Sequence, residues 1–351
     1  MKRLAEGLTR NHRDGKSTDL LFAFQSYGLD NVTEFCWGTS TNALGAPNFA
    51  SPIILSMKSS LLTHHLFKHF TTIRKTILGL PAWVVAKTSP EMAGLADLRN
   101  ILWKLVKHYV ANPSMLNDSK YPTIYSRLLD PSAYKNIPMP DENTLLEEGQ
   151  LMVFAGSTTV GDTLMTGFFH ILEQPILYQR LKDEVLVIWP VLDSPPSLEL
   201  LETLPLLTAT IKEALRVSPG ACSSLVRVVP DDGATISSYV VPGGTTVGMA
   251  SFFMHHSSEV FSEPESFHPD RWLDKNMQNL DQHLVPFSKG PRSCLGINLA
   301  WCELYIALAT LLRQFDMKLD GASAMNLVWR DCFTPLYYKD HAKAWCKPLT
   351  E

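Results

Sequence analysis

The stretch Phe287-Ser288-Lys289-Gly290-Pro291-Arg292-Ser293-Cys294-Leu295-Gly296 presents a cysteine on a glycine-containing loop. Directly after it, apolar residues recur at helical spacing, which predicts a helix from Ile297 to Phe315. The free N–H groups and the positive dipole end of that helix favour a thiolate at Cys294. Gly290 and Gly296 permit tight turns and the approach of a flat, bulky group, and Arg292 can hold an anionic group. The alternative is a structural cysteine in a loop.

The composition limits the classes of protein to which this chain can belong. It has 351 residues, with 31 Lys+Arg against 35 Asp+Glu and a net charge of −4, and no basic tract. These values argue against a protein that binds nucleic acid by neutralising phosphates. The six cysteines include no CxxC pair. We therefore expect an intracellular, reducing environment, in which a special cysteine is a metal ligand or a nucleophile.

The chain begins Met1-Lys2-Arg3-Leu4-Ala5-Glu6-Gly7, without an apolar stretch that could serve as a signal peptide or anchor. The segment nearest to a membrane span, Leu151 to Leu172, contains Asp162, His170 and several small polar residues. A buried helix explains this segment better than a bilayer does. We therefore predict no transmembrane anchor in this chain.

Periodicity and punctuation predict a mainly α fold with a minor β part, in one domain over residues 1–351. Besides the helix after the cysteine, the predicted helical segments are Asp19 to Gly38, Trp83, Leu95 to Val110, a turn at Thr123 to Leu129, Asp141 to Leu172, Pro175 to Ile188 and Leu206 to Val217. The predicted strands are Leu225 to Val229, Thr235 to Val241 and Thr245 to Met249, in one small sheet with hairpin signals at Asp232-Gly233 and Pro242-Gly243-Gly244, and short strands from Met317 to Glu351.

The pattern Phe-x-x-Gly-x-Arg-x-Cys-x-Gly at residues 287–296 resembles the cysteine-ligand loop of the cytochrome P-450 superfamily, the haem-thiolate monooxygenases. The resemblance implies an N-terminally truncated cytochrome P-450 fold that binds haem b (iron protoporphyrin IX). It implies that Cys294 is the axial ligand of the haem iron, on a loop that includes Phe287, Gly290 and Gly296. It also implies that Arg292 contacts a haem propionate, and Arg227 fits the same role or that of a surface strand residue.

Two further segments resemble the family in type and order. Lys212-Glu213-Ala214-Leu215-Arg216 is similar to its Glu-x-x-Arg helix, although such a pair alone is usually solvent-exposed. Phe267-His268-Pro269-Asp270-Arg271-Trp272 resembles its Pro-Glu-Arg-Trp stretch. The resemblance implies that Glu213, Arg216 and Arg271 form a buried structural network behind the haem.

A third segment, Phe154-Ala155-Gly156-Ser157-Thr158-Thr159, resembles the family's Ala-Gly-x-(Asp/Glu)-Thr motif over the distal face of the haem. Ala155, Gly156 and Thr159 fit the motif, but Thr158 stands at its acidic position. The resemblance implies that small residues let the helix approach the iron and that Thr159 delivers protons, with Ser157 or Thr158 plus water in place of the acid. Asp162 lies on the same helical face as Thr158 and is a candidate for the missing acid.

The resemblance implies a monooxygenase that inserts one oxygen atom of O2 into a small apolar molecule. Similarity to fungal enzymes of the trichodiene-oxygenase-like group suggests a terpenoid or polyketide intermediate of secondary metabolism. The implied electron donor is a separate NADPH-cytochrome P-450 reductase, and we expect a monomer, with the endoplasmic reticulum membrane surface as the family's usual location.

Typical members of this family are longer than the chain and carry an N-terminal anchor, strands and helices before the point where it starts. Two alternatives therefore stay open. One is a catalytically silent, haem-binding or haem-free remnant of the family. The other is a cysteine-nucleophile hydrolase, although none of the 11 histidines lies in a recognisable signature of that class.

Overall fold

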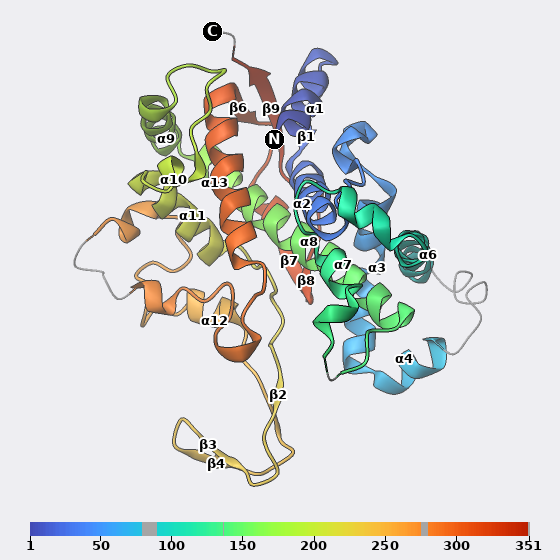
Figure 1. Ribbon diagram of the computed structural model, residues 1–351. Helices are drawn as coiled ribbons and strands as arrows, with labels where there is room; N and C mark the ends of the chain where they lie inside the picture. The colour runs from blue at the N-terminus through green and yellow to red at the C-terminus, as the bar shows by residue number, and fades with distance from the viewer. Residues whose placement is uncertain (79–89, 136, 275–279, 350–351) are drawn as a thin grey trace.

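A computed structural model of the chain describes residues 1–78, 90–135, 137–274 and 280–349 (Figure 1). Helices dominate the fold. They are α1 (Lys2–Arg13), α2 (Leu20–Trp37), α3 (Pro52–His69), α4 (Thr71–Leu78), α6 (Pro90–Ala111), α7 (Ile124–Leu128), α8 (Glu142–Glu173), α9 (Pro175–Ile188), α10 (Leu198–Leu201), α11 (Pro205–Val217), α12 (Ser251–His255) and α13 (Ile297–Gln314). Among the helices that the structure describes, none has both the length and the apolar character needed to cross a bilayer.

The strands form small antiparallel sheets, which confirms the predicted mainly α fold with a minor β part. Among the described residues, one sheet has three strands in the order β1–β9–β6, and the others are the two-stranded pairs β2–β5, β3–β4 and β7–β8. The strand bounds are β1 Thr18–Asp19, β2 Arg227–Val228, β3 Ala234–Ile236, β4 Tyr239–Val241, β5 Thr246–Val247, β6 Phe315–Leu319, β7 Trp329–Cys332, β8 Thr334–Tyr337 and β9 Lys343–Pro348.

Local capping residues set the ends of the central helices where the sequence predicts them. The Asp19 carboxylate accepts the N–H of Phe22 at 3.0 Å at the start of α2. Gly38 ends that helix with a φ of +73°, a conformation that glycine adopts without steric cost. The Asp141 carboxylate accepts the N–H of Thr144 at 2.7 Å and begins α8. The predictions for α2, α7, α8, α9, α11 and α13 are confirmed to within two residues at each end.

The predicted small sheet after Pro219 is wrong in two respects. Residues 235–241 are not one strand, because Ser237 and Ser238 have φ values of +47° and +70° and turn the chain between β3 and β4. The turns Asp232-Gly233 and Pro242-Gly243-Gly244, which were expected at hairpin tips, instead connect this β3–β4 hairpin to the separate β2–β5 ladder. The hairpin projects away from the helical body (Figure 1). No predicted helix covers α1, an amphipathic helix that buries Leu4 and Leu8, and the prediction at Trp83 lies outside the described residues.

The long helix α8 packs along α2 in the centre of the molecule, and this pair links the two buried apolar clusters (Figure 1). The contact is close because glycines face each other across it. A Cβ at Gly28 would lie 2.6 Å from the carbonyl oxygen of Gly156, and a Cβ at Gly156 would lie 2.7 Å from Val32 Cγ2. Helices α11 and α13 contact α8 and each other, and the three share one buried apolar cluster.

Candidate functional site

Cys294 lies on a tight loop that ends at the first turn of α13. Its N–H donates to the carbonyl oxygen of Phe287 at 2.9 Å, and the N–H of Ser293 donates to Gly290 at 3.0 Å, which closes the loop. Gly290 has a φ of +79°, so the turn needs a residue without a side chain there. The Cys294 thiol is free and exposed. It lies two residues before Gly296, the N-cap residue of α13.

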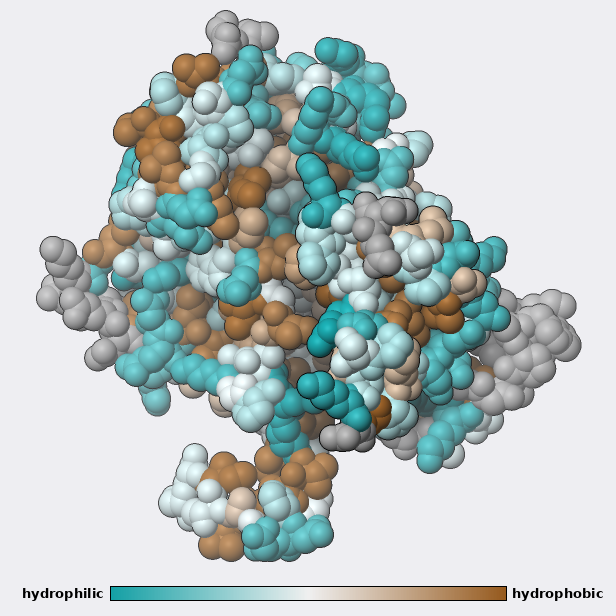
Figure 2. Space-filling model, in the orientation of Figure 1, coloured by the Kyte–Doolittle hydropathy of each residue, from teal (hydrophilic) through white to brown (hydrophobic). Residues whose placement is uncertain are grey.

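The loop that carries the cysteine is exposed from residue 289 to residue 296. Leu295, next to the cysteine, is 95% exposed. Arg292 is exposed and makes no ion pair with any residue that the structure describes, and Arg227 is exposed with one N–H donated to the carbonyl oxygen of Val226 at 2.8 Å. Figure 2 shows the β3–β4 hairpin as a projection with apolar residues on its surface. A bound molecule that contacts this surface would cover exposed apolar area.

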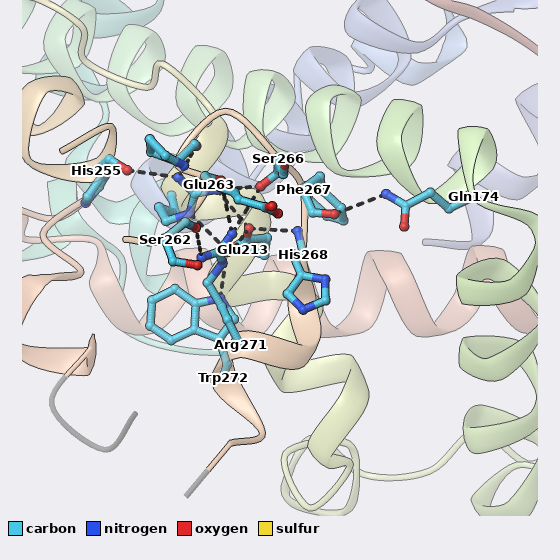
Figure 3. A network of polar contacts seen from close by, with 12 residues as sticks. Gln174, Glu213, His255, Ser262, Glu263, Ser266, Phe267, His268, Arg271 and Trp272 are labelled. Atoms are coloured by element: carbon cyan, nitrogen blue, oxygen red, sulfur yellow. Dashed lines mark hydrogen bonds and ion pairs between the residues drawn. The ribbon is translucent and has the colours of Figure 1, made fainter. Parts of the chain in front are cut away.

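Glu213 lies at the centre of a buried polar network (Figure 3). Its two carboxylate oxygens accept five hydrogen bonds, at 2.8–3.1 Å, from Arg216 (two), Arg271, the Trp272 indole and the backbone N–H of His268. Burial alone would raise the pKa of Glu213, but the hydrogen bonds and charge of Arg216, with those of its other partners, keep it below the ordinary value. Glu213 is therefore a stable buried carboxylate.

The two arginines extend this network to the irregular segment 255–266. Arg216 uses its five N–H donors on Glu213 and on the backbone carbonyl oxygens of His255, Pro264 and Ser266, at 2.6–3.0 Å. Arg271 donates to Glu213 and to the carbonyls of three residues between 262 and 266, with distances from 2.6 to 3.4 Å. A planar guanidinium has the donor geometry for such a task, because it bonds several acceptors at once. The structure thus brings Glu213, Arg216 and Arg271 together.

The hydroxyl-bearing residues of α8 point to different sides of the helix. The hydroxyls of Ser157, Thr158 and Thr159 donate to the carbonyls four residues earlier, at 2.5–2.7 Å. Ser157 and Thr158 are buried, whereas Thr159 is half-buried and lies on the exposed side with Ala155. Gly156 packs against Val32 of α2, so its small size serves the helix contact described above. Only part of the predicted motif therefore faces the open side of the molecule.

Asp162 lies one turn beyond Thr158 and faces the interior. Its Oδ1 accepts the hydroxyl of Tyr337 at 3.3 Å, and its buried Oδ2 has no partner among the described residues. Burial raises the pKa of Asp162 well above the ordinary value, although the Tyr337 hydrogen bond opposes this rise. A cavity of about 20 Å³ is lined by Thr158, Asp162 and Tyr337 together. The predicted common face of Thr158 and Asp162 is therefore confirmed, but it is a buried face.

Residues 1–329 match the profile of a known family, whose description is cytochrome P-450. The chain belongs to the cytochrome P-450 family. The match covers the α8 motif, the Glu213 network and the Cys294 loop, and it confirms the resemblance seen in the sequence.

Curated relatives of this P-450 chain come from fungi. The cytochrome P-450 monooxygenase flvC of Aspergillus flavus is 37% identical over 341 residues, which cover 95% of this chain and 62% of that protein. The monooxygenase macH of Penicillium terrestre is 34% identical, covering 92% and 64%. The N-acetyltryptophan 6-hydroxylase ivoC of Emericella nidulans is 32% identical, covering 91% and 63%. This chain thus spans less than two thirds of the length of these relatives.

The residues at the P-450 cysteine loop fit the haem that the family implies. A thiolate is a known ligand of haem iron, and Cys294 offers an exposed, free thiol. A haem also carries two carboxylates and a flat apolar ring. Arg292 and Arg227 are exposed guanidinium groups suited to carboxylates, and Leu295 is an exposed apolar side chain. A Cβ placed on Gly296 would lie 4.0 Å from the Cys294 sulfur, at an ordinary van der Waals distance.

Two residues of this P-450 site were absent from the predicted set. Trp272 was part of a quoted motif, but its indole N–H bond to Glu213, at 2.8 Å, was not foreseen. His255 lies in an otherwise unremarked segment, and its buried ring Nε2 accepts the N–H of Val285 at 2.9 Å. Burial, with the charge of Arg216, lowers the pKa of His255 to about 4, so its ring is neutral near pH 7. No local sequence signal marks this contact, because the two residues are 30 positions apart.

Proposed function

We propose that this chain is the haem-binding part of a monooxygenase that inserts one oxygen atom of O2 into a small apolar molecule. The observation that carries the proposal is the free, exposed Cys294 thiol at the start of α13. When bound there, haem b supplies the iron chemistry that activates dioxygen. In this proposal Cys294 holds the iron, Phe287, Gly290 and Gly296 shape the loop, and Arg292 and Arg227 hold the carboxylates of the haem.

Thr159 is the residue of α8 that we propose to hold a proton for the reaction. Its hydroxyl is on the exposed side of the helix beside Ala155, where a bound molecule can reach it. Thr158 and Asp162 line a cavity large enough for about one water molecule, which can stand in for the missing acidic residue. Ser157 is fully buried and its hydroxyl donates to the carbonyl oxygen of Val153, so nothing here supports a role for Ser157 in proton transfer. Proton transfer through positioned hydroxyls and water is ordinary general acid catalysis.

The substrate and the electron source are further parts of the proposal. We propose that electrons come from NADPH through a separate NADPH-cytochrome P-450 reductase, and that a monomer acts at the endoplasmic reticulum surface. A terpenoid or polyketide intermediate of fungal secondary metabolism is the substrate class proposed first. Two relatives are named for hydroxylation of N-acetyltryptophan and of tryptophan, so indoles form a second class for screening.

The test is the difference spectrum of the reduced chain with and without carbon monoxide, after expression with excess haem. We expect the red-shifted Soret band that is typical of thiolate ligation. Cys294→Ala should lose this band, whereas Cys302→Ala, in the helix α13 that follows the loop and half-buried, should keep it. A red-shifted band that survives in Cys294→Ala would overturn the ligand assignment.

Turnover then separates an active enzyme from a silent member of the family. The specific observation behind the silent alternative is the coverage of 62–64% of the relatives' length. A red-shifted band together with substrate-dependent NADPH oxidation, in the presence of the reductase, would support the monooxygenase. The band without NADPH oxidation would identify a silent haem protein, and no band would identify a haem-free remnant.

A further inference from the structure

His255 links the buried network to the cysteine loop by two hydrogen bonds of different kinds. Its backbone carbonyl accepts an N–H of Arg216 at 2.8 Å, as Figure 3 shows from the side of the network. Its ring Nε2 accepts the backbone N–H of Val285 at 2.9 Å. His255 is 1% exposed, so without this hydrogen bond its ring Nε2 would have no solvent partner.

The chain from Val285 to the cysteine is short and internally bonded. The carbonyl of Val285 accepts the N–H of Ser288 at 3.1 Å, and the carbonyl of Phe287 accepts the N–H of Cys294 at 2.9 Å. The Phe287 ring also lies against Trp301 of α13, with centroids 6.3 Å apart. Backbone hydrogen bonds therefore tie the segment that begins at Val285 to Cys294, three residues before α13.

We propose that His255 is a positioning residue that fixes the Val285–Cys294 loop relative to the Glu213–Arg216–Arg271 network. Glu213 orients Arg216, Arg216 holds the backbone of His255, and the ring of His255 holds the entry of the loop. The effect of His255 on metal ligation by Cys294 rests on the proposed function, whereas its effect on the position of the loop does not.

The bond requires an acceptor at one place in the side chain. Nε2 accepts only when the proton of the neutral ring is on Nδ1. A glutamine reaches about as far as Nε2 and can accept through its amide oxygen, whereas an asparagine is one methylene too short. His256 is the matched control, because its Nδ1 bonds to the carbonyl of Phe252 in its own turn and its ring stacks on Phe252 at 4.0 Å.

The experiment is hydrogen exchange of the Val285 amide in the full chain without added haem. We expect slow exchange in the wild type, His255→Gln and His256→Gln, and roughly tenfold faster exchange in His255→Asn, the effect of about one net hydrogen bond. Equal exchange in folded His255→Gln and His255→Asn would overturn the proposal. If His255→Asn fails to fold, fast exchange of the Val285 amide in folded His255→Gln would also overturn the proposal.

A second readout uses the same variants with haem. We expect His255→Gln and His256→Gln to keep the thiolate-type carbon monoxide band and His255→Asn to lose at least half of it. If no variant, wild type included, gives the band while the exchange pattern holds, the proposed function fails and the positioning role stands. If all variants give the full band with equal exchange at Val285, the positioning role fails and the proposed function stands.

Discussion

Glu213→Gln tests the energetics of the buried network directly. The carboxylate accepts five hydrogen bonds, three at Oε1 and two at Oε2. An amide that keeps its oxygen at the first position turns its NH2 toward two donors, from Arg216 and Trp272. The substitution also leaves two buried guanidinium groups without a counter-charge. Removing one partner of a buried ion pair costs about 3–5 kcal/mol, and we expect a loss of stability in that range.

The assay is urea unfolding followed by tryptophan fluorescence, with the free energy of unfolding compared between variants at pH 7. Glu259→Gln is the control, because Glu259 is exposed in the same irregular region and should change stability by less than ~0.5 kcal/mol. A loss below ~1 kcal/mol for Glu213→Gln would refute the reasoning. It would mean that the network relaxes around the amide or that the carboxylate is not ionised.

The pH dependence of the free energy of unfolding provides a second test of this prediction. The pKa of Glu213 is lower in the folded chain than its ordinary value of 4.5. A carboxyl of this kind contributes its stability above the unfolded-state pKa and loses it as the pH falls through the folded-state pKa. The stability difference between wild type and Glu213→Gln should therefore shrink below pH 4.5. A difference that stays constant down to the acid unfolding transition would contradict this sign.

Three further predictions concern α8 and its neighbours. Gly28→Ala should lower the midpoint of thermal unfolding, because the new Cβ would lie 2.6 Å from a backbone oxygen of α8 and overpacking costs ~1–3 kcal/mol. Gly15→Ala is the control. Its Cβ would enter open space, so it should cost less stability even though Gly15 has a φ of +65°. Asp162→Asn should raise the unfolding midpoint at pH 7. The folded-state pKa of Asp162 is raised, so the wild type loses stability as pH rises above 3.8, and the gain should vanish toward pH 4. Thr159→Val should lower product formed per NADPH by about tenfold or more, whereas Ser157→Ala should leave that ratio within twofold; equal effects would contradict the different exposure of the two hydroxyls.

The sequence predicts an element boundary best where one residue sets it. Asp19, Gly38 and Asp141 cap helices through bonds to residues at most four positions away, so their signals are visible in the chain itself. The turn at Ser237 and Ser238 was missed for the opposite reason. Neither residue is one that a left-handed turn usually selects, and the flanking β-branched residues continue the strand pattern across it.

The sequence predicts which residues form the site, but not which of their side chains face the interior. The sequence motifs identified Glu213, Arg216 and Arg271, but their approach depends on segments 55 residues apart, and only the resemblance to a family joined them. In the α8 motif, helical periodicity puts neighbouring residues on different faces without saying which face is buried. The structure shows Ser157 inside, Thr159 on the open side and Gly156 against α2. The His255 bond to Val285 is a tertiary contact, which no local pattern predicts.

The projecting β3–β4 hairpin provides a site at which a protease can cut the chain. Val240 is 85% exposed, and a two-stranded ribbon without further packing is marginally stable in water. A protease of broad specificity should therefore cut first near Ser237–Ser238, at the tip. The fragments 1–237 and 238–351 would remain together after the cut, because α8 and α11 of the first and α13 of the second bury the same apolar cluster. Nicking at the hairpin would thus give a non-covalent pair that can be reassembled from separately labelled halves, one with the Glu213 side of the network and one with Arg271 and Cys294.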